Sequence, residues 1–199
     1  MSNVLLVLSS PRIGESVSTK YATELATKIA AKAGNTLTTR DVAAHPLPSL
    51  DAVLIAATRS GKTELNTQEK AALDRAMMIV NEAKAADIIV IGAATMNFGP
   101  TTCLKGWIDH LAVPRQTFQY GANGPEGLIK DKKVYVVTTS SGIYGDGPGD
   151  YLTPWLAYTL GFMGMTDVEF IKMDGLAYGP QAVEKATNAA NEKIAAIAA

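Results

Sequence analysis

The sequence predicts an α/β fold in which helices cover both faces of one parallel sheet. Three observations support this prediction. Short apolar runs recur along the chain, as expected for strands that are buried on both faces. Between them lie segments in which apolar residues recur at every third or fourth position, the spacing of a helix face. Strand-like and helix-like segments alternate throughout, which favours parallel strands joined by crossover helices.

The first strand is predicted at residues 4–8, where VLLVL is wholly apolar. The first helix is predicted from Ser16 to about residue 33, because an apolar residue recurs at every fourth position: Val17, Tyr21, Leu25 and Ile29. Gly34 and Asn35 then end the helix. Residues 36–42 alternate weakly and are predicted as the second strand, followed by a loop that contains two prolines.

The second helix and the third strand come next. Asn66 and Glu69 have the spacing of a capping box, so we predict a helix from there to about residue 85. Residues 87–92, DIIVIG, are predicted as the third buried strand. Pro100 is typical of a first helical turn, and the apolar positions behind it predict another helix.

The last part of the chain continues the alternation. We predict a strand at residues 134–138, a helix at 148–162, a strand at 167–173 and a closing helix at 180–197. Residues 112–133 follow neither period. A loop of that length usually belongs to a binding site or to a partner contact.

Five strands alternating with five helices, without an internal repeat, predict an open, doubly wound parallel sheet. The flavodoxin-like strand order 2-1-3-4-5 fits this pattern best. No change of composition marks a linker, so residues 1–199 are expected to form a single domain.

Composition and charge exclude several classes of function. The chain is 47% hydrophobic and has a net charge of −1. It lacks the basic stripe of a nucleic-acid binder and the strong acidity of a carrier that docks through charge. Cys103 is the single cysteine, so an internal disulfide is excluded and a cytoplasmic location is expected. The first residues do not have the pattern of a signal peptide, and no apolar run has the length of a membrane helix. We therefore expect no membrane association.

The loop after the first strand is the first candidate site, because ligands of such sheets bind beyond the carboxyl ends of the strands. This loop and the helix start behind it carry four serines: Ser9, Ser10, Ser16 and Ser18. Serine hydroxyls and the free N–H groups of a helix N-terminus suit a phosphate. Arg12 can add charge at the rim. The alternative is an N-cap serine without any ligand, but the position directly after the first buried strand favours phosphate.

The same loop lacks the signatures of larger nucleotides. It has neither the Gly-Lys of a triphosphate loop nor the G-x-G-x-x-G of a dinucleotide site, so a mononucleotide with one terminal phosphate fits best. Residues 56–63, AATRSGKT, imitate a triphosphate loop, but the capping box at Asn66 places the helix start behind them. His45 and His110 have no companions at the spacing of metal ligands, and no metal site is predicted.

The loops after the third and fourth strands complete the predicted site. In AATMNFGP, Met96 and Phe98 are apolar where a loop is normally polar, and Asn97 lies between them. An apolar wall with one amide suits the edge of a flat heterocycle such as an isoalloxazine, whereas the alternative is that both side chains cap the core. TTSSGIYGDGPGD is rich in hydroxyls and glycines and contains Tyr144. Such a loop can bring backbone N–H groups close to a ring, and an ordinary glycine turn is its alternative.

These motifs carry a family resemblance. VLLVLSS…SVS, MNF, LKGWIDHLAVPRQTFQYGANGPEGL, GIYGDGP and TDVEFI…GLAYGP are similar to segments of bacterial FMN-dependent NADH azoreductases, a branch of the flavodoxin-like quinone reductases. The similarity covers nearly the whole chain. It implies an enzyme that transfers two electrons from NADH or NADPH through FMN to quinones or azo compounds. It further implies a ping-pong mechanism, in which donor and acceptor use the same slot in turn, and a homodimer with FMN at the subunit interface.

The resemblance also assigns residues to the site. The FMN phosphate position is matched by Ser10, Ser16, Val17 and Ser18, with Ser9 beside them. The P-M-Y-N-F pattern of the second loop is matched by Ala94, Thr95, Met96, Asn97 and Phe98, of which Asn97 and Phe98 are identical to it, and the last four of these residues are assigned to the FMN site. The third loop is matched by Thr139, Ser140, Ser141 and Gly142, with Ser140 in place of an arginine. Phe118, Tyr120 and Phe162 are similar to the aromatic residues that line the substrate pocket of the family, and Tyr144, which replaces a common histidine, is predicted to belong to the same pocket. Tyr144 is predicted to orient an acceptor oxygen.

Two other functions stay open at this point. A flavodoxin-type electron carrier would bind FMN but would not oxidise NADH. An FMN-free regulatory descendant of the fold would bind no flavin, since a fold alone does not fix a function. The departures from the family pattern at Ala94, Thr95, Met96 and Ser140 are compatible with this second alternative.

Overall fold

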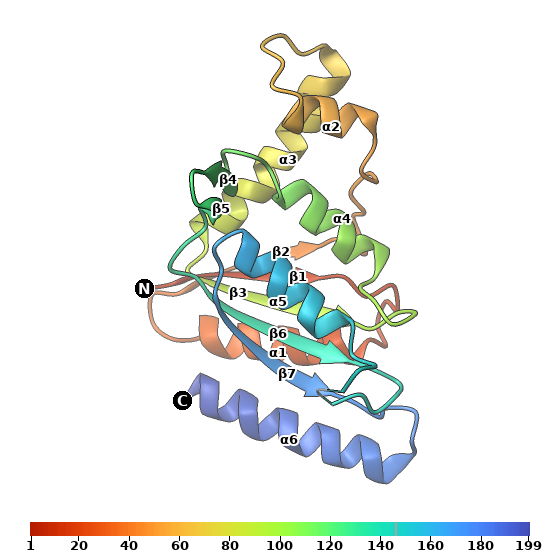
Figure 1. Cartoon of the computed structure of the whole chain (residues 1–199). Coiled ribbons are helices and arrows are strands. Elements are labelled where there is room, and N and C mark those ends of the chain that lie inside the picture. The colour runs from red at the N-terminus through yellow and green to blue at the C-terminus, as the bar shows by residue number, and fades with distance from the viewer. Residues whose placement is uncertain (146) are drawn as a thin grey trace.

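The computed structural model describes residues 1–145 and 147–199; Asp146 of the third loop and of the GIYGDGP motif lies outside the described residues. Five parallel strands form one sheet in the order β2-β1-β3-β6-β7 (Figure 1), which confirms the predicted order of the main strands. The strands are β1 (Asn3–Leu8), β2 (Thr36–Asp41), β3 (Ile88–Ala94), β6 (Lys133–Thr139) and β7 (Asp167–Met173). Every predicted strand agrees with an observed one to within two residues at each end.

Helices cover both faces of this sheet (Figure 1). One face is covered by α1 (Val17–Ala30) and α6 (Pro180–Ala198). The other face is covered by α3 (Thr67–Ala85), α4 (Thr102–Leu111) and α5 (Leu152–Phe162). The predicted capping box of α3 is confirmed, because the Asn66 side chain accepts the N–H of Glu69 at 2.9 Å and the Glu69 side chain accepts the N–H of Asn66 at 3.0 Å.

The continuous apolar sequence of β1 is explained by burial on both sides. Val4 and Leu6 belong to the hydrophobic core beneath α1 and α6. Leu5 and Val7 point the other way, into the larger core beneath α3, α4 and α5. All four side chains are at most 1% exposed. Successive residues of one strand therefore supply two separate cores, which leaves no polar face for the strand to show.

Two helices begin later than predicted. α4 does not include Pro100; it is capped by Thr101, whose hydroxyl accepts the N–H of Leu104 at 3.1 Å. α5 begins at Leu152 rather than at residue 148, and the Asp150 carboxylate accepts the N–H of Thr153 at 2.9 Å. At both places a polar side chain, and not the proline, fixes where the helix starts.

The prediction of five helices is wrong by one. An additional helix, α2 (Ala52–Arg59), follows the proline-containing loop. Its N-cap is Asp51, whose carboxylate accepts the N–H of Leu54 at 2.8 Å. Figure 1 shows α2 and the start of α3 extending away from the sheet.

Residues 112–133, which were expected to be a loop, contain a small antiparallel hairpin. Its strands are β4 (Phe118–Gly121) and β5 (Gly124–Gly127). The N–H of Ile129 donates to the carbonyl of Met163 at 2.9 Å and so ties the hairpin to the end of α5. The hairpin lies at the amino-end edge of the parallel sheet, away from the arrowheads of the strands (Figure 1).

Lowering the pH from 7.5 to 5.5 is expected to reduce the free energy of unfolding by about 1 kcal/mol, because of His110. This side chain is 1% exposed, and its Nδ1 lies 2.9 Å from the carbonyl of Gly106. Burial lowers the pKa of His110 although the Gly106 carbonyl opposes the shift. The unfolded chain therefore binds a proton more readily than the folded one, and stability is lost as the pH falls below about 6.5.

Denaturant titrations at several pH values test this expectation. His110→Gln should flatten the dependence of the free energy of unfolding on pH between 7.5 and 5.5. An equal slope in the wild type and in His110→Gln would contradict the assignment.

Candidate active site

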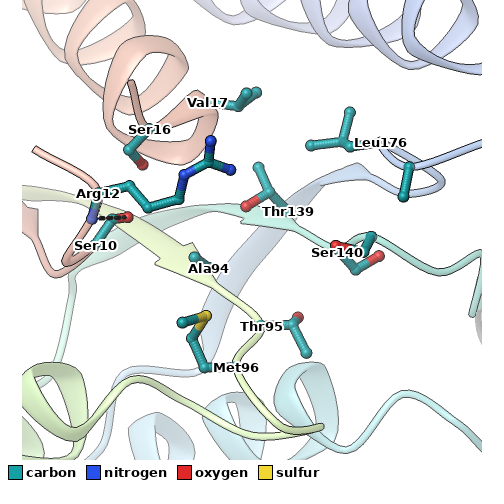
Figure 2. A pocket seen from close by; sticks show the side chains of 12 residues that line it. Ser10, Arg12, Ser16, Val17, Ala94, Thr95, Met96, Thr139, Ser140 and Leu176 are labelled. Atoms are coloured by element: carbon teal, nitrogen blue, oxygen red, sulfur yellow. Dashed lines mark hydrogen bonds between the residues drawn. The ribbon is translucent and has the colours of Figure 1, made fainter. Parts of the chain in front are cut away.

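Four of the parallel strands end around one cavity. β1, β3, β6 and β7 have their carboxyl ends at the same edge of the sheet, where their loops enclose a cavity of about 250 Å³ (Figure 2). The cavity is lined by Ser10, Arg12, Ser16, Val17, Ala94, Thr95, Met96, Thr139, Ser140, Ser141, Leu176 and Ala177. The three predicted loops therefore do meet, and a fourth loop joins them.

The first loop presents hydrogen-bond donors to the cavity. Ser16 caps α1 by accepting the N–H of Thr19 at 3.2 Å. Within the described part of the chain, the N–H groups of Val17 and Ser18 in the first turn have no acceptor. Arg12 extends its guanidinium into the cavity (Figure 2), and its ion pair with Glu15 is long, at 3.6 Å. Free N–H groups, hydroxyls and one cation together form a site for an anion.

Two of the predicted serines have another role. Ser9 is fully buried, and its hydroxyl donates to the carbonyl of Gly92 at 2.8 Å, which joins the end of β1 to β3. Ser18 is also fully buried, and its hydroxyl lies 3.1 Å from that of Ser16. A Cβ on Gly92 would lie only 3.1 Å from the carbonyl oxygen of Ser18, so α1 packs closely on β3 at this point. Neither serine lines the cavity; both hold the loop that does.

The second loop is a tight turn with apolar side chains. Met96 and Gly99 exchange two backbone hydrogen bonds, of 2.9 and 3.0 Å, across Asn97 and Phe98. Asn97 and Phe98 both have positive φ, 48° and 68°, a conformation that is common for asparagine and unusual for phenylalanine. Met96 is 43% and Phe98 57% exposed, so these two side chains do not cap the core. Met96 lines the cavity, whereas Asn97 and Phe98, the next two residues of the turn, do not.

The third loop is joined to the loop after β7. The N–H groups of Leu176 and Ala177 donate to the carbonyls of Ser140 and Ser141, at 3.1 and 3.2 Å. Predicted Gly142 does not line the cavity, but its lack of a side chain makes room for the ring of Tyr144. That ring lies 6.2 Å from the ring of Phe98, centroid to centroid. Tyr144 therefore lies next to the second loop, which supplies the lining residues Thr95 and Met96.

Four lining residues were absent from the predicted set of cofactor-binding residues: Arg12, Ala94, Leu176 and Ala177. Arg12 was expected only at the rim. The residues after β7 were missed because the sequence motif GLAYGP suggested no chemistry. The strand order contained the necessary signal, since β7 lies beside β6 and their carboxyl ends share one edge.

The remaining pocket residues lie elsewhere. Phe118 packs on Phe162 with a centroid distance of 4.6 Å and on Tyr120 at 5.9 Å. Phe162 ends α5, close to the start of β7, so this aromatic cluster lies at the amino-end edge of the sheet. The cavity lies at the carboxyl edge, roughly 20 Å away along a seven-residue strand. Within one chain, the aromatic cluster and the cavity are therefore separate.

The other sequence signals carry no site. Residues 56–63 include the end of α2, and the Lys62 ammonium donates to the Glu69 carboxylate at 2.7 Å, so this segment is not a phosphate loop. Among the described residues, no group of three or more His, Cys, Asp or Glu side chains could hold a metal ion. In the same residues, no helix has the length and apolar character needed to cross a membrane.

Comparisons with known proteins agree with this geometry. A family model described as flavodoxin-like fold matches residues 2–198. The chain is 50% identical to the FMN-dependent NADH:quinone oxidoreductase of Agrobacterium fabrum, with 100% of this chain and 98% of the relative covered. It is 45% identical to the protein of that name from Rhizobium leguminosarum bv. trifolii, with the same coverage. The crystal structure of an azoreductase from Bacillus anthracis superimposes with a TM-score of 0.90 at 29% identity, covering 100% of this chain and 99% of that one. The chain thus belongs to the FMN-dependent NADH:quinone oxidoreductases, the azoreductase family with a flavodoxin-like fold.

Proposed function

We propose that this chain is an FMN-dependent enzyme that transfers two electrons from NADH to quinones and azo compounds. The observation that carries the proposal is the cavity at the carboxyl edge of the sheet, which combines an anion site with an apolar wall. Two relatives that are 50% and 45% identical, each covered to 98% of its length, are named FMN-dependent NADH:quinone oxidoreductase, and the similar structure from Bacillus anthracis is named an azoreductase. The single cysteine supports the cytoplasmic location that completes the proposal.

The residues of the cavity fit FMN. The anion site offers donors and the cation of Arg12 to a phosphate, and no carboxylate is among the residues that line the cavity. Thr95 and Met96 would lie along the flat ring, and Thr139, Ser140 and Ser141 would offer hydroxyls and N–H groups to its polar edge. FMN, when bound, supplies the two-electron chemistry, and the chain supplies position and electrostatics.

Tyr144 is the side chain that we propose for orienting the acceptor, because it follows the lining residues Ser140 and Ser141 in the third loop and its ring lies beside that of Phe98 in the second loop. Its hydroxyl can donate to a quinone oxygen. Tyr144→Phe is expected to lower kcat/KM for quinones about tenfold, the worth of one hydrogen bond made in the transition state, and to leave FMN affinity unchanged. Steady-state kinetics with several quinones measure this. Unchanged kcat/KM for every quinone would remove Tyr144 from the mechanism.

The proposal includes a homodimer with FMN at the interface. The cavity of one chain is small for a ligand of this size, since sites for such ligands commonly have about 300–1,000 Å³. Tyr120 is 76% exposed on the aromatic cluster, and Phe98 is 57% exposed in the loop that lines the cavity with Thr95 and Met96. A second copy that placed its cluster over this loop would bury both surfaces and complete the substrate pocket. Sedimentation analysis of the FMN-loaded protein measures the oligomeric state.

The visible spectrum of the purified protein with FMN, before and after anaerobic addition of NADH, tests the function. A bound flavin spectrum that bleaches with NADH supports the enzyme. A bound flavin that neither NADH nor NADPH bleaches would indicate an electron carrier instead. Bleaching by NADPH but not by NADH would show that the electron donor is NADPH rather than NADH. The absence of flavin binding would refute the proposal.

A further inference from the structure

Asp174, the first residue after β7, lies behind the third loop and has no role in the reaction as described so far. Its carboxylate accepts three hydrogen bonds from that loop. Oδ1 accepts from the hydroxyl of Ser140 at 2.8 Å, and Oδ2 accepts from the N–H groups of Gly145 at 2.7 Å and Tyr144 at 3.2 Å. In the part of the chain that the structure describes, all three donors are neutral groups. One side chain thereby joins both ends of the segment 140–145.

Further contacts make this segment rigid. The N–H of Gly175, next to Asp174, donates to the carbonyl of Gly142 at 2.7 Å. The ring of Tyr144 fills the space above Gly142, where an added Cβ would lie 2.7 Å from Cζ and 2.8 Å from the hydroxyl of Tyr144. The position of the phenol ring therefore depends on the backbone at residues 142–145, which Asp174 holds.

The carboxylate also lies close to the cavity. Ser140, which donates to it, is a lining residue, so the negative charge of Asp174 is one hydrogen bond behind the cavity wall. Lys172, two residues before Asp174 in the chain, is paired with Asp150 at 2.8 Å and donates to the carbonyl of Gly145 at 2.8 Å. Charges act over such distances more strongly inside a protein than in water. An anion at this place opposes the increase of negative charge that reduction brings to a bound flavin.

We propose that Asp174 is a positioning residue that fixes Tyr144 and the third-loop wall, and that its charge lowers the reduction potential of the bound FMN. The second half of this inference rests on the proposed function, whereas the first half is a property of the chain alone.

Two substitutions separate the two effects. Asp174→Asn keeps an oxygen that can accept from the N–H groups of Tyr144 and Gly145. Its NH₂ group can donate to the Ser140 oxygen. The Ser140 hydroxyl can then donate to the Gly142 carbonyl, which lies 2.7 Å away in the wild-type structure. This variant removes the charge and keeps the loop. Asp174→Ala removes all three hydrogen bonds. Should Asp174→Ala fail to fold, as judged by circular dichroism, Asp174→Ser replaces it, because serine is too short to reach all three donors.

Backbone hydrogen exchange of residues 140–145 in the flavin-free protein tests the positioning. We expect exchange to be at least about tenfold faster in Asp174→Ala and within about twofold of the wild type in Asp174→Asn. A wild-type rate in Asp174→Ala would overturn the positioning role. The result does not depend on FMN, so it stands apart from the proposed function.

The reduction potential of the bound FMN tests the charge. In Asp174→Asn we expect FMN affinity in the reduced state to gain about tenfold over that in the oxidised state, which raises the potential by about 30 mV for a two-electron couple. Asp167→Asn is the matched control, because Asp167 is an exposed carboxylate at the opposite end of β7. Its potential should equal that of the wild type. An unchanged potential in Asp174→Asn, or an equal shift in Asp174→Asn and Asp167→Asn, would overturn the charge effect. A wild-type protein that binds no flavin would instead refute the proposed function.

Discussion

Ser16→Asp is expected to weaken FMN binding by at least about 100-fold without destabilising the protein. Aspartate caps a helix as well as serine does, so the hydrogen bond that the Thr19 N–H donates to Ser16 can be kept. The new carboxylate would lie in the wall of the cavity, where the phosphate of FMN carries close to two negative charges. Repulsion of about 3 kcal/mol between charges about 4 Å apart corresponds to this loss of affinity. Fluorescence titration with FMN measures it, and thermal unfolding reports the stability.

The matched control for this change is Ser16→Asn. Asparagine has the size of aspartate and caps helices equally well, but it is neutral, so its affinity for FMN should stay within about tenfold of the wild type. Riboflavin, which lacks the phosphate, should bind the wild type and Ser16→Asp equally. Equal weakening in both variants would mean that volume, and not charge, limits the site. Unchanged FMN affinity in both Ser16→Asp and Ser16→Asn would show that the first loop does not bind the phosphate.

Gly127→Ala is expected to destabilise the protein by about 3 kcal/mol, the upper part of the range for added volume in a packed interior. A Cβ at Gly127 would overlap the backbone of Met163 and Gly164, which cannot move like the end of a flexible side chain. Gly164 in turn has a φ of 101°, and a Cβ there would lie 2.9 Å from the carbonyl oxygen of Ile129. The melting temperature should fall by about 10 °C.

Gly121→Ala, in the other strand of the same hairpin, is the control. Its Cβ would lie 3.8 Å from the nearest heavy atom, the carbonyl oxygen of Gly124, which is an ordinary contact. Its free energy of unfolding should stay within about 0.5 kcal/mol of the wild type. Calorimetry measures the melting temperatures of Gly127→Ala and Gly121→Ala. Equal values would show that the hairpin does not pack closely on the turn after α5.

The parallel sheet was predictable from sequence because its central strands β1, β3 and β6 are largely apolar runs between polar loops, whereas β2, TLTTRD, had only a weak alternation to indicate it. α2 was not predicted, since Leu54 is its single buried residue and its apolar sequence resembles a strand leading into a phosphate loop. The β4–β5 hairpin was not predicted either. Its second strand, GPEG, combines residues that disfavour strands, and backbone contacts such as the one between Ile129 and Met163 hold it in place.

The site was predictable where chemistry follows from local sequence. Ser16 was predicted as an N-cap, and the position of its loop after the first strand pointed to the cavity. The directions of Ser9 and Ser18 were not predictable, because a hydroxyl has the same local signature whether it faces a ligand or a neighbouring strand. The contribution of Leu176 depends on the pairing of two loops that are far apart in the sequence.

The distance between the cavity and the aromatic cluster has a genetic consequence if two copies complete each other's sites. A chain with an inactivating substitution at Ser16 would still have an intact aromatic cluster, and a chain with an inactivating substitution at Phe162 would still have an intact cavity. Neither chain paired with itself would have a working site. A mixed pair would have one, formed by the intact halves, so that two inactive alleles of this protein would complement each other within one cell.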